Sequence, residues 1–240
     1  MFTRMIIGAT MIGSTAFGVN TVMDNMGIKA TEAAFAQPSQ QRIVIGLDLS
    51  LSNPLVSDKM YSTKVAQRVA EEIQGLAPRS EVIVRSFGSY DASSNPLRFN
   101  ETISAKKRPD VVAKNIETLV ANIPSLVDAG RIKGQGRTNI IAFLENMTQV
   151  VDCSDGITTQ FILLTDGVEE SEYADLRNAN ARLPENVVKA RGQCDELQIL
   201  GLGQGLGSPS ETQRLRVEWQ NWATGDANKP FVQFVGLNDW

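Results

Sequence analysis

The stretch at residues 42–52, RIVIGLDLSLS, constrains the fold of this 240-residue chain more than any other. Residues 43–47 form a short apolar run rich in β-branched side chains, which is typical of a strand buried in a parallel sheet. Directly after it, Asp48, Ser50 and Ser52 place one carboxylate and two hydroxyls at alternate positions. Ligands bind at the carboxyl ends of the strands in open α/β sheets. Oxygen-bearing side chains at that end are suited to a hard divalent cation.

Composition and charge exclude several classes of function. The net charge is −4 and is spread without long blocks, so we expect no nucleic acid partner. The chain contains no histidine, which excludes serine and cysteine triads, most zinc hydrolases and haem ligated by histidine. At 42% hydrophobic and 21% charged residues, the composition is that of an ordinary soluble globular protein.

Strand and helix patterns alternate along the chain. We expect strands over residues 43–47, 81–87, 97–104, 160–165, 196–202 and 231–235, the third of them at a sheet edge. Amphipathic helices are expected over residues 61–76, from Pro109 to Ile123, over residues 140–147, and after a cap at Ser210. This alternation predicts an α/β fold with a doubly wound, mostly parallel central sheet and helices on both faces.

The N-terminal region has the features of an export segment. Arg4 precedes an uncharged, mostly small and apolar stretch at residues 5–23, and an A-x-A cleavage pattern stands at residues 34–36. Three charged residues separate the stretch from that pattern, and a disordered arm is the alternative. We predict an export signal or membrane anchor at residues 1–36. One domain at residues 37–240 would then be periplasmic or extracellular.

Two further segments complete a pattern with the opening strand. Thr138 leads from a loop with three glycines into a predicted helix, and Asp166 directly follows a predicted strand. The combination DLSLS … GRTN … LLTDG resembles the von Willebrand factor type A family and its metal-ion-dependent adhesion site, over roughly residues 42–236. By this resemblance the metal ligands would be Asp48, Ser50, Ser52, Thr138 and Asp166.

The resemblance also implies a function. Mg²⁺ would be the bound metal, with Mn²⁺ or Ca²⁺ as alternatives, and its open position would take an Asp or Glu carboxylate from a partner protein. The chain would then be an adhesion or scaffold domain rather than an enzyme. It departs from the family pattern at Arg137, where glycine is usual before the threonine, and at Pro54, which stiffens the first loop. Neither change removes an oxygen ligand.

Three alternatives remain for these residues. A metal-dependent phosphate-ester hydrolase could use Asp48 as nucleophile or ligand, although Ser50 stands where such enzymes place a second carboxylate. A structural subunit could hold its metal permanently inside a larger assembly. The same side chains could also be plain helix caps and turn residues. The oligomeric state is not indicated by the sequence.

Three more features have two interpretations each. The sheet order implied by the resemblance brings Cys153 and Cys194 to one edge, which permits a disulfide; two buried unpaired thiols are the alternative. Four acidic residues follow Asp166, at positions 169, 170, 172 and 175, and a solvated loop is favoured over an acidic rim for the metal. The glycines at residues 201–207 do not fit GxGxxG, so a tight turn is favoured over a dinucleotide site.

Overall fold

The structure is a computed structural model that describes residues 39–89, 95–185 and 191–239. The predicted export segment at residues 1–36 and the domain boundary at residue 37 lie outside these ranges and stay predictions. Within the described ranges, no helix has the length and apolar character needed to cross a membrane.

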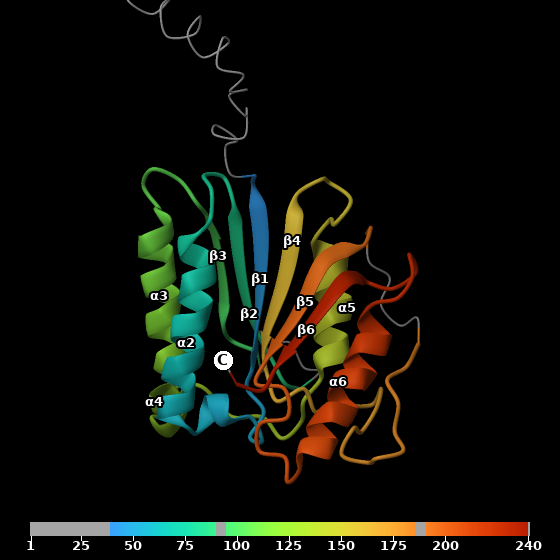
Figure 1. Cartoon of the computed structure of the whole chain (residues 1–240). Coiled ribbons are helices and arrows are strands. Elements are labelled where there is room, and N and C mark those ends of the chain that lie inside the picture. The colour runs from blue at the N-terminus through green and yellow to red at the C-terminus, as the bar shows by residue number, and fades with distance from the viewer. Residues whose placement is uncertain (1–38, 90–94, 186–190, 240) are drawn as a thin grey trace, which may run out of the picture. The chain divides into compact units, whose positions relative to one another are not determined.

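A six-stranded sheet forms the centre of the fold, with strand order β3-β2-β1-β4-β5-β6 (Figure 1). The strands are β1 Gln41–Asp48, β2 Glu81–Phe87, β3 Arg98–Thr102, β4 Thr158–Leu164, β5 Cys194–Leu200 and β6 Phe231–Leu237. Edge strand β3 is antiparallel to β2, and all other neighbours are parallel. All six predicted strands are confirmed, and the opening strand β1 lies in the middle of the sheet.

Helices cover both faces of this sheet. The helical segments are the 3₁₀ turn η2 Pro54–Val56 and α2 Lys59–Gln74, α3 Pro109–Ala121, α4 Ile123–Asp128, α5 Ile140–Val150 and α6 Pro209–Ala223. Helices α2, α3 and α4 lie on one side of the sheet, and α5 and α6 lie on the other (Figure 1). The predicted doubly wound α/β fold is therefore confirmed.

Proline placement explains two differences from the predicted helices. The helix expected from Pro109 to Ile123 ends at Ala121, and α4 begins at Ile123, because Pro124 lacks an N–H and is tolerated only in a first turn. The predicted cap at Ser210 is wrong. Ser208 caps α6 by accepting a hydrogen bond from the backbone of Glu211, because Pro209 fits the first helical position.

The core consists of two apolar layers, one on each side of the sheet. Ile43, Ile45 and Leu47 pack under α2 and α3, whereas Val44 belongs to the layer under α5 and α6. Gly46 lies under α5, and a Cβ at that position would be 2.7 Å from a side-chain carbon of Leu163. Strand β1 is thus buried on both faces, as its continuous apolar run predicts.

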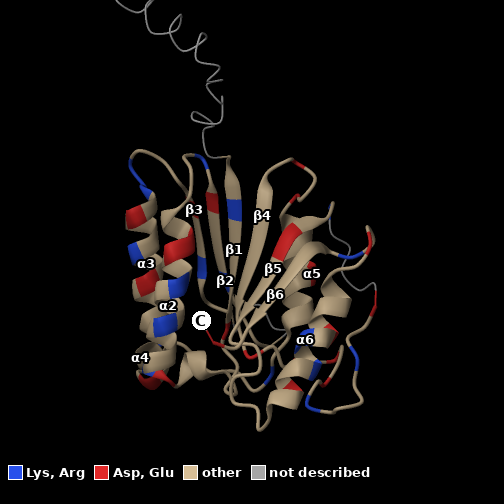
Figure 2. Cartoon of the chain, viewed as in Figure 1, with Lys and Arg blue, Asp and Glu red and all other residues tan. Residues whose placement is uncertain are grey.

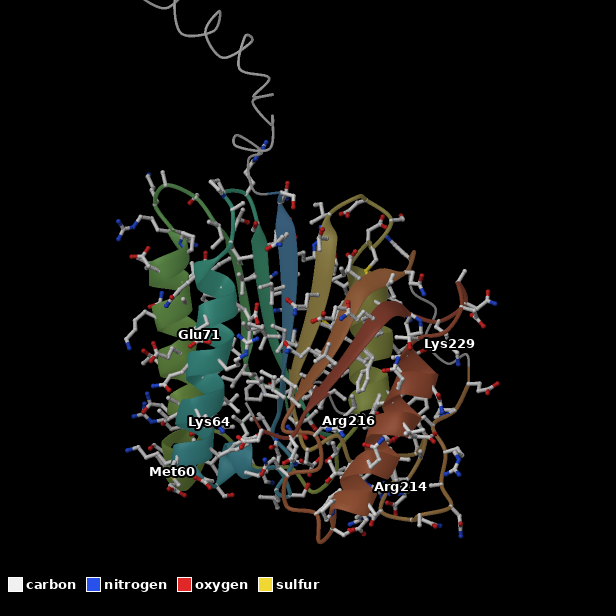
Figure 3. All side chains as sticks on the ribbon, viewed as in Figure 1. Met60, Lys64, Glu71, Arg214, Arg216 and Lys229 are labelled. Atoms are coloured by element: carbon white, nitrogen blue, oxygen red, sulfur yellow. A yellow bond between two sulfur atoms is a disulfide. The ribbon has the colours of Figure 1, made fainter. Side chains whose placement is uncertain are left out.

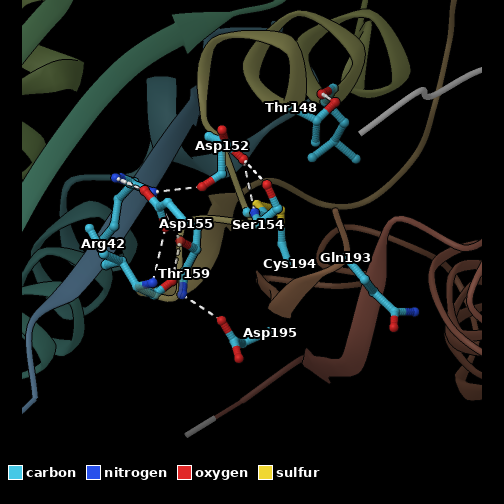
Figure 4. The surroundings of a disulfide bond; sticks show 12 residues. Arg42, Thr148, Asp152, Ser154, Asp155, Thr159, Gln193, Cys194 and Asp195 are labelled. Atoms are coloured by element: carbon cyan, nitrogen blue, oxygen red, sulfur yellow. Dashed lines mark hydrogen bonds and ion pairs between the residues drawn. A yellow bond between two sulfur atoms is a disulfide. The ribbon is translucent and has the colours of Figure 1, made fainter. Parts of the chain in front are cut away.

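A disulfide closes the amino-terminal edge of the sheet (Figure 4). Cys153 and Cys194 are bonded, with their Cα atoms 5.0 Å apart, so the alternative of two unpaired thiols is wrong. Beside it, the buried Arg42 guanidinium forms ion pairs with Glu81 and Asp155, each at 2.8 Å. Figure 2 shows that charged residues otherwise concentrate on the helices and loops. The opposite edge, where the parallel strands end, carries the candidate site.

Candidate metal centre

Asp48 is the last residue of β1, and both of its carboxylate oxygens accept hydrogen bonds. Oδ1 accepts from the backbone N–H of Ser50 at 2.8 Å, and Oδ2 accepts from the hydroxyl of Thr165 at 2.7 Å. The side chain is fully buried. The local Asx turn with Ser50 is what bends the chain away from the sheet, and it fixes the carboxylate at the carboxyl end of the strand.

The two serines lie on the turn that follows. The hydroxyl oxygens of Ser50 and Ser52 are 3.3 Å apart, with Ser50 buried and Ser52 exposed. Ser52 also lies close to the neighbouring loop, since burial raises the pKa of Asp166 and the Ser52 hydroxyl opposes that rise. The serine pair therefore connects the end of β1 with the residue that follows β4.

Asp166 lies two residues after the end of β4 and is also buried, at 3% exposed. One carboxylate oxygen accepts a hydrogen bond from the backbone of Val168 at 2.9 Å. Its backbone carbonyl accepts from Gly203, in the turn after β5, at 2.8 Å. Asp48 and Asp166 are therefore both fixed in orientation at adjacent strand ends.

Thr138 comes from a third segment that is tied to the other two through its backbone. Its N–H donates to the carbonyl of Glu170 at 3.3 Å, and the Glu170 N–H donates back at 2.8 Å. Three residues earlier, Gln135 exchanges backbone hydrogen bonds of 2.8 Å with Leu49 and Leu51. Thr138 is 1% exposed, and its hydroxyl forms no hydrogen bond within the described ranges. The threonine oxygen is thus uncommitted beside the two aspartate loops.

Burial is the largest cause that raises the pKa of both aspartates. Burial, followed by the negative charge of Asp166, raises the pKa of Asp48 to about 7. Burial raises the pKa of Asp166 to about 6. No lysine or arginine among the described residues lies within 4 Å of either carboxylate, and Arg137 is exposed without an ion pair. Two buried carboxylates without a cation favour either a proton or a metal ion.

One acidic residue contradicts the solvated-loop prediction. Glu169 is fully buried and accepts hydrogen bonds from the backbone N–H groups of Ile140, at 2.7 Å, and Ile141, at 3.2 Å. It therefore caps the amino terminus of α5, where the helix dipole favours a negative charge. Burial is the main cause that raises the pKa of Glu169 to about 7, and the negative charge of Asp48 adds a smaller contribution. Glu169 joins the loop after Asp166 to the helix that begins beside Thr138.

Two buried supporting residues were missed by sequence reasoning. Thr165 donates to Asp48 and accepts from the backbone of Gly167 at 3.1 Å. Asn53 donates to the carbonyls of Asp48, at 3.0 Å, and Leu164, at 2.9 Å, which joins the ends of β1 and β4. The sequence did contain a signal for both residues. Thr165 directly follows an apolar strand and Asn53 directly follows the Asp-Ser turn, and a polar residue that is buried at such a position needs hydrogen-bond partners.

The glycine-rich turn after β5 has a packing role. Gly201 has φ of +109°, and a Cβ there would lie 2.0 Å from the hydroxyl of Tyr61 on α2. Burial, and then the charges of Asp166 and Asp48, raise the pKa of Tyr61. This glycine therefore lets a tyrosine approach the aspartates, in agreement with the tight-turn interpretation.

The side chains brought together form an oxygen-only donor set. No group of three or more His, Cys, Asp or Glu residues that could hold a metal occurs in the described part of the chain. A metal would consequently depend on hydroxyls as well as carboxylates. Two aspartates and up to three hydroxyls match the preference of Mg²⁺, Mn²⁺ or Ca²⁺ for hard oxygen ligands. The residues present fit such an ion.

Comparisons with known proteins give structural likenesses only. No protein-family model and no curated protein matches the chain. One similar solved structure is an aerotolerance-related membrane protein from Bacteroides fragilis, at 15% identity and a TM-score of 0.41, covering 82% of this chain and 91% of that one. BatB from Bacteroides thetaiotaomicron is similar at 14% identity and a TM-score of 0.40, covering 83% and 91%. The pilus adhesin SpaC from Lactobacillus rhamnosus GG is similar at 14% identity and a TM-score of 0.44, covering 83% and 28%.

Proposed function

We propose that this chain is a von Willebrand factor A-like domain that binds a partner protein through a divalent metal. Asp48, Ser50, Ser52, Thr138 and Asp166 would hold Mg²⁺, with Mn²⁺ or Ca²⁺ as alternatives. The metal would accept a carboxylate from the partner in an open coordination position. The observation that carries this proposal is the pair of buried aspartates, which lack a cationic side chain within 4 Å in the described ranges and lie beside hydroxyls from neighbouring loops.

The charged and the neutral residues of the site would have different roles. Asp48 and Asp166 supply the negative charge that attracts the cation, and the serines and Thr138 supply neutral oxygens. Two carboxylates balance the charge of a divalent ion without exceeding it, so an added carboxylate from outside would meet less repulsion than at a site with three or more carboxylates. Thr165 and Glu169 would keep Asp48 and the Thr138 loop in position.

An exposed apolar rim supports protein binding at this edge. Leu51, in the same turn as the serines, is 64% exposed, and Met60 at the start of α2 is 81% exposed. Figure 3 shows Met60 at the end of α2 that lies toward the carboxyl ends of the strands. Large exposed apolar side chains near a polar centre are typical of interaction surfaces.

The geometry favours recognition over turnover. Asp48 is fully buried, and both of its oxygens accept hydrogen bonds. A carboxylate buried in this way is a poor nucleophile toward a phosphate ester, because a substrate of that size cannot approach it. Export would keep the Cys153–Cys194 disulfide oxidised, so a periplasmic or extracellular location, with or without an N-terminal anchor, belongs to the same proposal.

Water-proton relaxation with Mn²⁺ tests this proposal on the full chain. Mn²⁺ bound with an exchangeable water should enhance relaxation, and added N-acetylglutamate should lower the enhancement by displacing that water. Ser50→Ala should weaken Mn²⁺ binding, whereas the matched control Ser57→Ala, an exposed serine at the end of η2, should not. Equal Mn²⁺ affinity in both variants, or no effect of N-acetylglutamate, would contradict the proposed function.

A further inference from the structure

A cavity lined by polar, charged and apolar side chains lies beside the candidate metal centre. It has a volume of about 270 Å³ and lies between β2, β3 and α5. Its lining includes the tilted pair of rings of Phe87 and Phe143, whose centroids are 4.7 Å apart. Cavities for drug-sized ligands span roughly 300–1,000 Å³, so this one suits one or two side chains of a peptide segment.

Two arginines line this cavity without an acidic partner. Arg85 on β2 and Arg98 on β3 are directly opposite in the antiparallel register, so their side chains share one face of the sheet. Neither has a carboxylate within 4 Å among the described residues. Within the described part of the chain, Arg85 donates to neutral oxygens: the carbonyls of Val84 and Phe99, and the side chain of Asn100 at 2.6 Å.

Like charges directly opposite on a sheet are destabilising. Burial, followed by the positive charge of Arg98, lowers the pKa of Arg85. An anion placed between the two guanidinium groups would relieve this repulsion through charge-assisted hydrogen bonds. The net charge of −4 and the small size of the cavity argue against nucleic acid as the source of that anion.

Residues that line the cavity are neighbours of the candidate metal ligands in the sheet and along the chain. Phe87 is the register partner of Asp48 and accepts a backbone hydrogen bond from Leu49 at 2.9 Å. Asn139, which follows Thr138, lines the cavity and donates to the carboxylate of exposed Glu172. A peptide segment held at the metal centre would therefore lie close to this cavity.

We propose that this cavity binds a second acidic side chain of the partner, next to an aromatic or aliphatic side chain that packs on Phe87 and Phe143. Arg85 and Arg98 would hold the carboxylate. This inference rests on the proposed function only for the position of the partner, since the arginines bind without a metal. It makes the preferred partner segment acidic at more than one position.

Fluorescence anisotropy on the full chain tests this inference with two labelled peptides, one containing Glu-Phe-Glu and one containing Gln-Phe-Gln. In EDTA the Glu-Phe-Glu peptide should bind, and Arg98→Glu should weaken it at least about tenfold. Arg98→Glu places opposite charges across the strands, so this variant should be no less stable than the wild type. Lys106→Glu makes the same change in charge at an exposed residue beyond β3 and should leave binding unchanged.

The same titration in Mg²⁺ separates this inference from the proposed function. Mg²⁺ should tighten binding of the Glu-Phe-Glu peptide, and Asp48→Asn should remove that tightening while the dependence on Arg98 persists. If Mg²⁺ has no effect but Arg98→Glu still weakens binding, the proposed function fails and the cavity stands. If Arg98→Glu binds as the wild type does, if Lys106→Glu loses as much, or if Gln-Phe-Gln binds equally, the cavity proposal is overturned.

Discussion

Asp48→Asn removes one charge from the buried aspartate pair while keeping the shape of the side chain. Its amide oxygen can still accept the hydrogen bond from Ser50, whereas the bond with Thr165 must reverse its direction. The perturbation therefore isolates the electrostatic cost of holding this carboxylate ionised in the fold.

The pKa of Asp48 sets the magnitude. It rises from 3.8 to about 7, and each unit corresponds to about 1.4 kcal/mol, so ionisation in the metal-free fold costs on the order of 4 kcal/mol. Part of this cost is repulsion from Asp166. Reversing the hydrogen bond with Thr165 costs the variant about 1 kcal/mol. We expect metal-free Asp48→Asn to be more stable than the wild type by about 1–3 kcal/mol at pH near 8.

The sign of the pH dependence follows from the raised pKa. Between about pH 4 and 7 the folded state holds a proton that the unfolded state has lost, so metal-free wild type loses stability as pH rises through this window. The advantage of Asp48→Asn should accordingly shrink toward about pH 5. Metal opposes this advantage, because saturating Mg²⁺ at about 100 times its Kd adds roughly 2.7 kcal/mol to the wild type alone.

Urea unfolding with EDTA and with Mg²⁺, each at two pH values, measures all of these terms. The reasoning is refuted if metal-free Asp48→Asn is less stable than the wild type at pH near 8, or if its advantage is independent of pH. Equal stabilisation of both proteins by Mg²⁺ would refute the metal part alone.

Four further outcomes are expected. Mg²⁺ affinity measured by calorimetry should fall as pH is lowered from about 8 to about 5.5, because protons compete for Asp48 and Asp166, and a flat profile would contradict this. Thr138→Val should weaken Mg²⁺ at least about tenfold with unchanged circular dichroism, and an unaltered Kd would remove Thr138 from the ligand set. Glu169→Ala should lower stability by about 1–2 kcal/mol in urea unfolding, since the N–H groups of Ile140 and Ile141 in the first turn of α5 lose their acceptor, and a neutral effect would argue against that role. Reducing the disulfide, whose cysteines are 41 residues apart, should lower stability by about 4 kcal/mol in the same assay; a change below about 1 kcal/mol would show that it restrains little.

Periodicity was sufficient for the fold because apolar runs and stripes depend on neighbours in sequence. The β1 run and the α5 stripe were each predicted from four or five residues, and both are buried as expected. Helix ends were less predictable. Ser208 and Ser210 both suit a cap, and only the position of Pro209 between them decides which one is used.

The loops that carry the candidate site were predictable from the sequence, but the contacts between their buried side chains were not. The strand pattern placed Asp48 and Asp166 at one edge, because parallel strands finish together, and the helix that starts after Thr138 brought the threonine to the same edge. The burial of Glu169 depends on the approach of α5 from another part of the chain, and no local pattern distinguishes it from its solvated neighbours. The same holds for Arg85 and Arg98, which face each other only through the register of β2 and β3.

Calorimetric titration of the full chain with Mg²⁺ tests the central claim most directly. Wild type and the control variant Ser57→Ala should each bind one Mg²⁺ per chain, and Asp166→Asn should lose that binding while retaining its circular dichroism spectrum. If folded wild type binds no Mg²⁺, or if Asp166→Asn binds it with unchanged affinity, the five residues are caps and turn residues and the account is wrong.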